Sequence, residues 1–210
     1  GNHSFSQFNP AVSLDLQLTD TQSINLGWSQ ASRTPSPAEL SCADENDPCR
    51  LPNGFVADPP LDQVVTKTLE LSYIGKHDAL DVYANLFYSD SEDDIIFQQA
   101  GAIASRGYFI NIDKTVRKGL ELSLNHSIGD MHYQLGYNFL DATFGSSFTS
   151  FSPLNPQGPN RTVNSGDAIP GHAKHMVKAN IDYELSDNLT TGLEMVLASD
   201  QYYRGDEANE

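Results

Sequence analysis

The stretch VTKTLELSYIGKHDALDVYANLFY, residues 65–88, decides how this chain folds. Before the short turn 76–79, an apolar row alternates with polar residues: Val65, Leu69, Leu71 and Tyr73 against Thr66, Thr68, Glu70 and Ser72. After the turn, the next apolar row is Leu80, Val82, Ala84, Leu86 and Tyr88. Because successive side chains of an extended strand point to opposite faces, this period of two predicts two antiparallel strands joined by a short turn.

The same alternation continues on both sides of this hairpin. The upstream rows are Val12, Leu14, Leu16 and Leu18, and then Ile24, Leu26 and Trp28. The downstream rows are Val116, Leu120, Leu122 and Leu124; Tyr133, Leu135, Tyr137 and Phe139; Val177, Ala179, Ile181 and Tyr183; and Leu189, Leu193, Met195 and Leu197. The sequence therefore predicts an all-β chain of about eight strands, without a persuasive helix.

Short and long connections alternate strictly along the chain. The short turns are residues 19–22, 76–79, 129–130 and 186–188. Long stretches rich in Gly, Pro and Ser lie near Ser32–Leu61, Ser91–Asn111, Gly145–Gly171 and from Ser199 onward. Several long loops at one end of a sheet are uncommon in a compact soluble domain. We therefore expect an antiparallel up-and-down transmembrane β-barrel segment, with short periplasmic turns and long extracellular loops.

The two faces of the predicted strands differ in charge. Charged and imidazole side chains enter the apolar rows only toward strand ends, at Lys67, Lys118, His126 and His175. An aromatic girdle near the short turns would include Tyr73, Tyr133 and Tyr183. The opposite face carries the acidic row Asp15, Glu70, Asp81, Glu121, Asp182, Glu184 and Glu194. That face has too many charges for a dry interior, and we expect it to meet water or another polar body.

Composition excludes several classes of protein. The 210 residues carry 28 acidic against 12 basic side chains and a formal charge of -16, which argues against a nucleic-acid partner. No window approaches the roughly 20 apolar residues of a membrane-spanning helix. The first residues have no secretory signal.

A soluble β-sandwich is the alternative fold, because its strands also alternate between apolar and polar residues. A closed barrel of only about eight strands would leave little room for the acidic row.

Several short motifs resemble the barrel of TonB-dependent outer-membrane receptors. They are FSQFNPAV at 5–12, SRTP at 32–35 with AEL at 38–40, GYF at 107–109 leading through Asn111 and Lys114 to GLE at 119–121, LDAT at 140–143, and YYRGDE at 202–207. The motifs keep their order and their position relative to the predicted strands over nearly the whole chain.

The resemblance implies a barrel of about 22 strands that is plugged by an amino-terminal domain. Residues 1–210 would then be a partial barrel domain that lacks the plug, the TonB-contacting segment and the final strands. We expect a multi-pass barrel in the outer membrane of a Gram-negative bacterium. Its partners would be lipid and lipopolysaccharide, the plug of the full-length chain and, through the missing amino-terminal part, the TonB complex. Alone, such a piece would have unpaired strand edges.

Two cysteines, Cys42 and Cys49, enclose six residues of a long loop. In an oxidising compartment this spacing predicts a disulfide, with free thiols or a metal site as the alternatives. Asp44, Glu45 and Asp47 lie inside the loop. Their spacing does not match an EF-hand, so solvated surface acids explain them better than a calcium site does.

No motif supports a metal site, a cofactor or catalysis. His172 and His175 follow Pro170-Gly171 and precede a strand, where side chains three apart point in different directions. The sequence contains no glycine-rich phosphate loop and no nucleophile elbow. We therefore expect neither a bound metal nor an enzyme.

The leading hypothesis is active uptake of a scarce nutrient, and the resemblance implies a ferric siderophore with energy supplied through TonB. Because aromatic residues and Arg dominate recognition hot spots, ligand contacts are expected from the loop residues Tyr108, Phe109, Phe148, Phe151, Tyr202, Tyr203 and Arg204. One alternative is a passive porin-like barrel lined by the same acids. The other is a soluble, calcium-dependent β-sandwich that binds a ligand.

Overall fold

The computed structural model describes residues 4–46, 48–50, 61–101, 106–152 and 155–210, and its main feature is a single antiparallel sheet. The long strands follow the order β1 (Ala11–Thr19), β2 (Gln22–Arg33), β4 (Val64–His77), β5 (Leu80–Gln99), β6 (Arg106–Ile128), β7 (Met131–Phe144), β10 (His175–Ser186) and β11 (Leu189–Ala198). Each strand pairs with the one that precedes it along this path. The predicted all-β, up-and-down architecture is confirmed.

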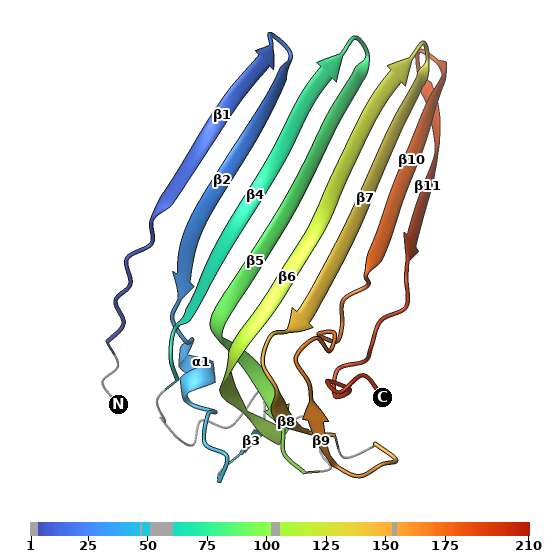
Figure 1. The fold of residues 1–210 in the computed structure, drawn as a ribbon. Coiled ribbons are helices and arrows are strands. Elements are labelled where there is room, and N and C mark those ends of the chain that lie inside the picture. The colour runs from blue at the N-terminus through green and yellow to red at the C-terminus, as the bar shows by residue number, and fades with distance from the viewer. Residues whose placement is uncertain (1–3, 47, 51–60, 102–105, 153–154) are drawn as a thin grey trace.

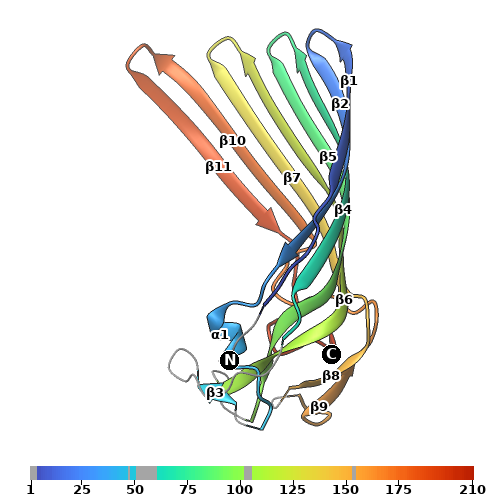
Figure 2. The same cartoon turned by 90° about the vertical axis from the view of Figure 1, so that its left-hand side faces the viewer.

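The two ends of the sheet differ in structure. Figure 1 shows the β1–β2, β4–β5, β6–β7 and β10–β11 turns together at one end, which we call the turn end. The other end, which we call the loop end, holds both chain termini, the one-turn helix α1 (Pro37–Leu40), β3 (Cys49–Arg50), β8 (Phe148–Phe151) and β9 (Asn160–Val163). Figure 2 shows that the sheet is a curved wall.

Strand register places the apolar rows on one continuous face of this wall. One row runs across the sheet through Leu14, Leu26, Leu71, Leu86, Leu120 and Phe139. Leu14, Leu86 and Leu193 are 67%, 52% and 69% exposed, so they do not converge in a dry interior. A β-sandwich would bury these side chains between two sheets, and the single sheet rules out that alternative. We call this surface the apolar face.

Aromatic residues border the apolar face toward both ends. Toward the turn end lie Tyr73, Tyr133 and Tyr183, as the sequence predicts. Toward the loop end, Trp28 and Tyr88 both flank Leu69 in register, and Phe139 lies opposite Leu120. Tyrosine and tryptophan side chains are enriched at the two interfaces of membrane barrels.

The opposite, polar face holds the seven acids of the predicted row. Glu121 lies opposite Asn85, and Glu194 lies opposite Asn180. Neighbouring amides and hydroxyls hydrogen bond along this face: Asn25 Nδ2 donates to Asp15 Oδ1 at 2.6 Å, and Ser72 Oγ to Asn85 Oδ1 at 3.0 Å. The polar side chains of neighbouring strands are thus bonded to one another along this face.

The loop end is more ordered than the sequence predicts. The sequence predicts a long loop over 91–111, yet β5 continues to Gln99 and β6 begins at Arg106. The reason is that Ile95, Ile96 and Phe97 pair in register with residues 109–111 and extend the hairpin beyond the sheet. Likewise, β8 and β9 form a hairpin inside the predicted loop 145–171.

A single helical turn, α1, lies in the predicted loop after β2 and leaves the all-β class unchanged. Ser36 caps it, since Ser36 Oγ accepts from the Glu39 backbone N at 3.2 Å and Glu39 Oε2 accepts from the Ser36 backbone N at 2.7 Å. Arg33 also donates to Glu39 at 2.8 Å. Burial alone would raise the pKa of Glu39, but the hydrogen bonds from Arg33 and Ser36 outweigh it, and this pKa lies below its usual value. A four-residue helix is too short to show a helical period in the sequence.

Candidate functional site

A small hydrophobic core on the polar face supports the loop end. Ile112, Phe144 and Val163 are its buried members, and Ile96, Ile110, Phe148, Ile169 and Ala208 pack against them. Phe144 lies on the polar face because it pairs with Thr115, which lies opposite Ser91. The described parts of these loops therefore fold over the polar face.

A backbone turn at Asp93 directs one acid into this region. Asp93 has a φ of 56°, a left-handed conformation that is uncommon for a residue other than glycine. Directly after it, Asp94 Oδ2 accepts from Thr115 Oγ1 at 2.7 Å and from Arg117 Nη2 at 3.2 Å. Arg117 Nη1 also donates to Thr115 Oγ1 at 2.9 Å. The result is an ion pair held on the polar face beneath the loops.

The segment 199–210 lines one hollow together with this ion pair, and hydrogen bonds to neighbouring loops hold the segment in place. Ser150 Oγ donates to Glu207 Oε2 at 3.1 Å, and Glu207 Oε1 accepts from the Gly205 backbone N at 3.0 Å. Asn209 bonds both backbone groups of Ala168, accepting from its N at 2.5 Å and donating to its O at 2.9 Å. Glu210 forms an ion pair with Arg161 of β9.

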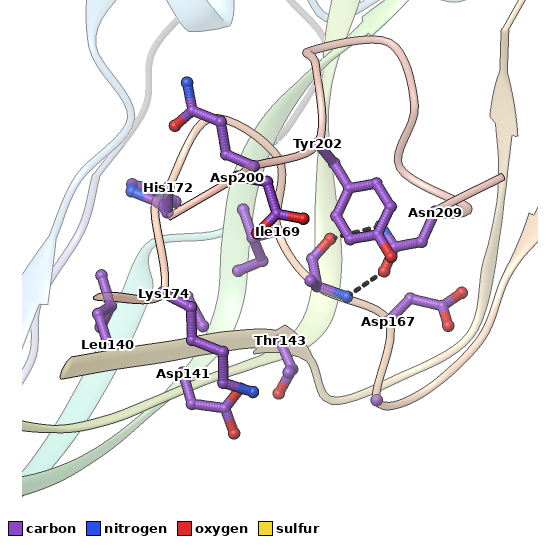
Figure 3. A pocket seen from close by; sticks show the side chains of 14 residues that line it. Leu140, Asp141, Thr143, Asp167, Ile169, His172, Lys174, Asp200, Tyr202 and Asn209 are labelled. Atoms are coloured by element: carbon purple, nitrogen blue, oxygen red, sulfur yellow. Dashed lines mark hydrogen bonds and ion pairs between the residues drawn. The ribbon is translucent and has the colours of Figure 1, made fainter. Parts of the chain in front are cut away.

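Three adjoining hollows open between the segment 199–210 and the sheet, and we call them together the vestibule. The first, of about 490 Å³, is lined by Asp94, Arg117, Phe151, Arg204 and Glu207 among others. The second, of about 570 Å³, is drawn in Figure 3, where Asp141 and Lys174 lie on one side and Tyr202 and Asn209 on the other. The third, of about 620 Å³, includes Tyr203. His172 lines all three hollows.

Four of the seven predicted ligand-binding residues meet in the vestibule. Phe151 and Arg204 line the first hollow, Tyr202 the second and Tyr203 the third. Together with the acids Asp94, Glu207 and Asp141 of the lining, they bring both charge signs and aromatic rings around the vestibule. Such a mixture can orient a polar organic ligand and cover its apolar parts.

The other three predicted residues lie elsewhere. Phe148 packs in the loop-end core, with its ring 5.0 Å from that of Phe144. The Tyr108 hydroxyl accepts a bond from Gln98 Nε2 at 3.2 Å, and the Phe109 ring lies against Phe97 at 5.3 Å. Tyr108 and Phe109 adjoin the cysteine loop because the Phe109 backbone N donates to Cys42 O at 2.6 Å.

The cysteine loop is closed in the structure by a disulfide between Cys42 and Cys49, whose Cα atoms lie 5.4 Å apart. Asp44 is bonded locally to the Asn46 backbone N at 2.9 Å, and Asp47 lies outside the described residues. No group of three or more His, Cys, Asp or Glu side chains in the described part of the chain is placed to hold a metal ion.

Sequence reasoning missed His172, Asp94 and Arg117 as vestibule residues. Asp94 and Arg117 lie 23 positions apart on two strands and meet only through register and the turn at Asp93. The spacing of His172 from His175 raises only the question of a metal ligand and gives no sign of the vestibule. His175 instead bonds Tyr137 on the apolar face, with Nδ1 and Oη 3.0 Å apart.

The whole chain, residues 1–210, matches the family described as TonB dependent receptor-like, beta-barrel. The chain belongs to the TonB-dependent receptors. This confirms the resemblance seen in the sequence motifs. Barrels of this family are outer-membrane proteins, and the family consists of transport receptors that bind small molecules such as siderophores. None of the described helices is long and apolar enough to cross a membrane.

Solved TonB-dependent receptors share the fold at low sequence identity. The siderophore receptor PirA from Acinetobacter baumannii matches 92% of this chain with a TM-score of 0.63 and 14% identity. The copper transporter OprC matches 93% with a TM-score of 0.66 and 18% identity. The ferric yersiniabactin uptake receptor FyuA from Yersinia pestis matches 94% with a TM-score of 0.64 and 15% identity. The chain spans 29%, 27% and 26% of these proteins, respectively.

Proposed function

We propose that this chain is part of an outer-membrane receptor that takes up a ferric siderophore, with energy supplied through the TonB complex. In this proposal, the apolar face contacts lipid and the polar face surrounds a plug domain of the full-length protein. The vestibule at the extracellular end receives the ligand. The observation that carries the proposal is the vestibule itself, which combines Arg204, His172 and aromatic rings above the polar face.

Family membership favours this receptor over a passive porin. A porin lined by the same acids would conduct cations without selecting a bound ligand. The segment 199–210 and the β8–β9 hairpin instead build a ligand-sized space at the mouth of the polar face. Reading the gene upstream of residue 1 for a plug domain separates the two possibilities.

Growth on single iron sources tests the cargo. A deletion strain should lose growth on one ferric siderophore and regain it with the wild-type gene. A double variant, Phe151→Ala with Arg204→Ala, should lower uptake of that siderophore at limiting concentration by about tenfold, since two recognition contacts are removed. Phe8→Ala is the control, because Phe8 is exposed and outside the vestibule. Unchanged growth of the deletion strain on every siderophore would contradict the proposal.

A further inference from the structure

The charged residues that line the vestibule are mostly acidic. Among the described lining residues, the acids are Asp94, Asp141, Asp167, Asp200 and Glu207. The bases are Arg117, Lys174 and Arg204. Five negative and three positive charges give the lining a net charge of -2, with His172 counted as neutral. The whole chain has the same sign, with a formal charge of -16, so its electric field does not favour an anionic ligand.

Two of the three lining bases are already paired with acids. Arg117 Nη2 lies 3.2 Å from Asp94 Oδ2, and Lys174 Nζ lies 2.9 Å from Asp141 Oδ1. Lys118 reaches the same Asp141 carboxylate at 3.3 Å from outside the vestibule, which changes the net charge from -2 to -1. Among the described lining residues, Arg204 is therefore the only base without an ion pair. An anionic chelate would meet a single unpaired guanidinium in this part of the receptor.

Three acids of the lining have no basic side chain beside them in the described part of the chain. Glu207 and Asp167 each accept a hydrogen bond from a backbone N, at 3.0 and 2.7 Å, which holds their position but leaves their charge. The Asp200 carboxylate forms neither a hydrogen bond nor an ion pair with the described residues, and only its backbone O accepts, from Ser199 Oγ at 3.1 Å. Asp200 can therefore pair with a cationic group of a ligand.

Aromatic rings lie in the same hollows as Asp200. This residue lines the second hollow with Tyr202 and the third with Tyr203, and the two tyrosines are 43% and 83% exposed. Figure 3 draws Asp200, Tyr202 and His172 around the second hollow. A carboxylate and exposed aromatic rings together can hold an ammonium group, by an ion pair and by cation–π attraction. The first hollow, which has two acids and two bases, is electrically neutral by comparison.

We propose that the vestibule selects a ferric siderophore with a neutral iron core and a free ammonium group, and that Asp200 and Tyr202 receive this group. The first hollow then holds the core, where Arg204 donates to oxygen atoms of the ligand. A chelate of three hydroxamates belongs to this class, because each hydroxamate cancels one charge of Fe³⁺. A chelate of three catecholates does not, since it keeps several negative charges. This charge class rests on the proposed uptake function and adds to it.

The test compares two probes on the purified full-length receptor. They are ferric desferrioxamine B, a linear trihydroxamate that ends in a primary ammonium, and its N-acetylated form, which lacks this charge. By isothermal titration calorimetry, the wild type should bind the ammonium form about fivefold more tightly, since an exposed ion pair and a cation–π contact together contribute about that factor. The difference should shrink in about 0.5 M salt, because salt screens exposed charges.

Substitution of Asp200 tests whether this residue causes the preference. Asp200→Asn should lower the affinity for the ammonium form to that for the acetylated form, because the carboxylate charge is lost while the shape of the side chain is kept. Asp187→Asn is the matched control. It removes the same charge from an exposed residue in the β10–β11 turn, at the opposite end of the sheet, and should keep the preference. Heat-dependent gel mobility confirms that each variant is folded.

Several results would overturn this charge class. They are equal affinities of the wild type for the two probes, a preference that survives in Asp200→Asn, or the same loss in Asp187→Asn. Absence of binding of both probes, or tighter binding of ferric enterobactin, a polyanionic tricatecholate, would also overturn it. An error in the uptake function has a different result, which is normal growth of the deletion strain on every ferric siderophore. A deletion strain that loses growth only on an anionic siderophore would contradict the charge class and leave the uptake function standing.

Discussion

At the residue scale, the sheet depends on glycines that lie beneath aromatic rings. A Cβ built on Gly119 would collide with the Phe139 backbone O and with the Phe87 ring across the strand. Phe87 lies opposite Gly119 in register, so its ring fills the place that a side chain would take. At the loop end, Gly107 lies beneath the ring of Phe97, which is its diagonal neighbour, since Gly107 pairs with Gln99. The absence of a side chain is therefore what allows these rings to pack against the strand.

We predict that Gly119→Ala destabilises the folded receptor by about 1–3 kcal/mol, since the added methyl group forces the ring and the backbone of β7 to shift. The loss of stability is measured as a fall in the temperature at which the barrel no longer migrates as the folded form on a semi-native gel. Gly136→Ala is the matched control, because the nearest atoms to its Cβ are at 3.9 Å and ordinary contact results. Equal transition temperatures for the two variants would show that the close packing at Gly119 does not contribute to the stability of the barrel.

At the element scale, the cysteine loop is a separate unit attached to the end of β6. The disulfide joins Cys42 to Cys49, β3 pairs with β6 over two residues, and Cys42 O accepts from the Phe109 backbone N. These contacts involve only the part of β6 beyond the sheet. Because the closed loop is short, the disulfide limits local conformations more than it stabilises the whole barrel.

Reduction with dithiothreitol should therefore open this loop while the barrel stays folded. We predict faster trypsin cleavage after Arg50, next to Cys49, in the reduced protein, with no change in heat-dependent gel mobility. The Cys42→Ser, Cys49→Ser double variant should reproduce the cleavage in the absence of reductant. A lower unfolding temperature of the barrel in the reduced protein would contradict this prediction. The cysteine loop would then unfold cooperatively with the barrel.

The strands could be predicted from sequence much better than the site. Period-two rows such as Leu80 to Tyr88 depend on local side-chain alternation, which any window of the sequence contains. Beyond Ser91 the alternation fails, because Asp93 turns the backbone and places Asp94 and Ile96 on the polar face. The vestibule depends on this change and on contacts such as Ser150 with Glu207, 57 residues apart. Loop aromatics pointed to Phe151 and Tyr202, but composition alone could not separate them from Phe148, which packs in the core.

At the scale of the whole molecule, the sheet is a wall with two chemically distinct faces and two open edges. Among the described strands, β1 pairs only with β2, and β11 only with β10. In the full-length receptor we expect these edges to pair with further strands, since lipid does not tolerate unpaired backbone groups. The exposed leucines of the apolar face and the acids of the polar face then have different surroundings, lipid for the leucines and water or a plug for the acids.

Spin labels on the full-length receptor in lipid vesicles test this division most directly. Labels at Leu86→Cys and Gln134→Cys occupy the apolar and the polar face, and the native disulfide leaves Cys42 and Cys49 unlabelled. We predict that oxygen, which concentrates in lipid, relaxes the label at 86, whereas a water-soluble nickel complex relaxes the label at 134. The reverse pattern, or shielding of the label at 86 from both reagents, would contradict the assignment of the apolar face to lipid.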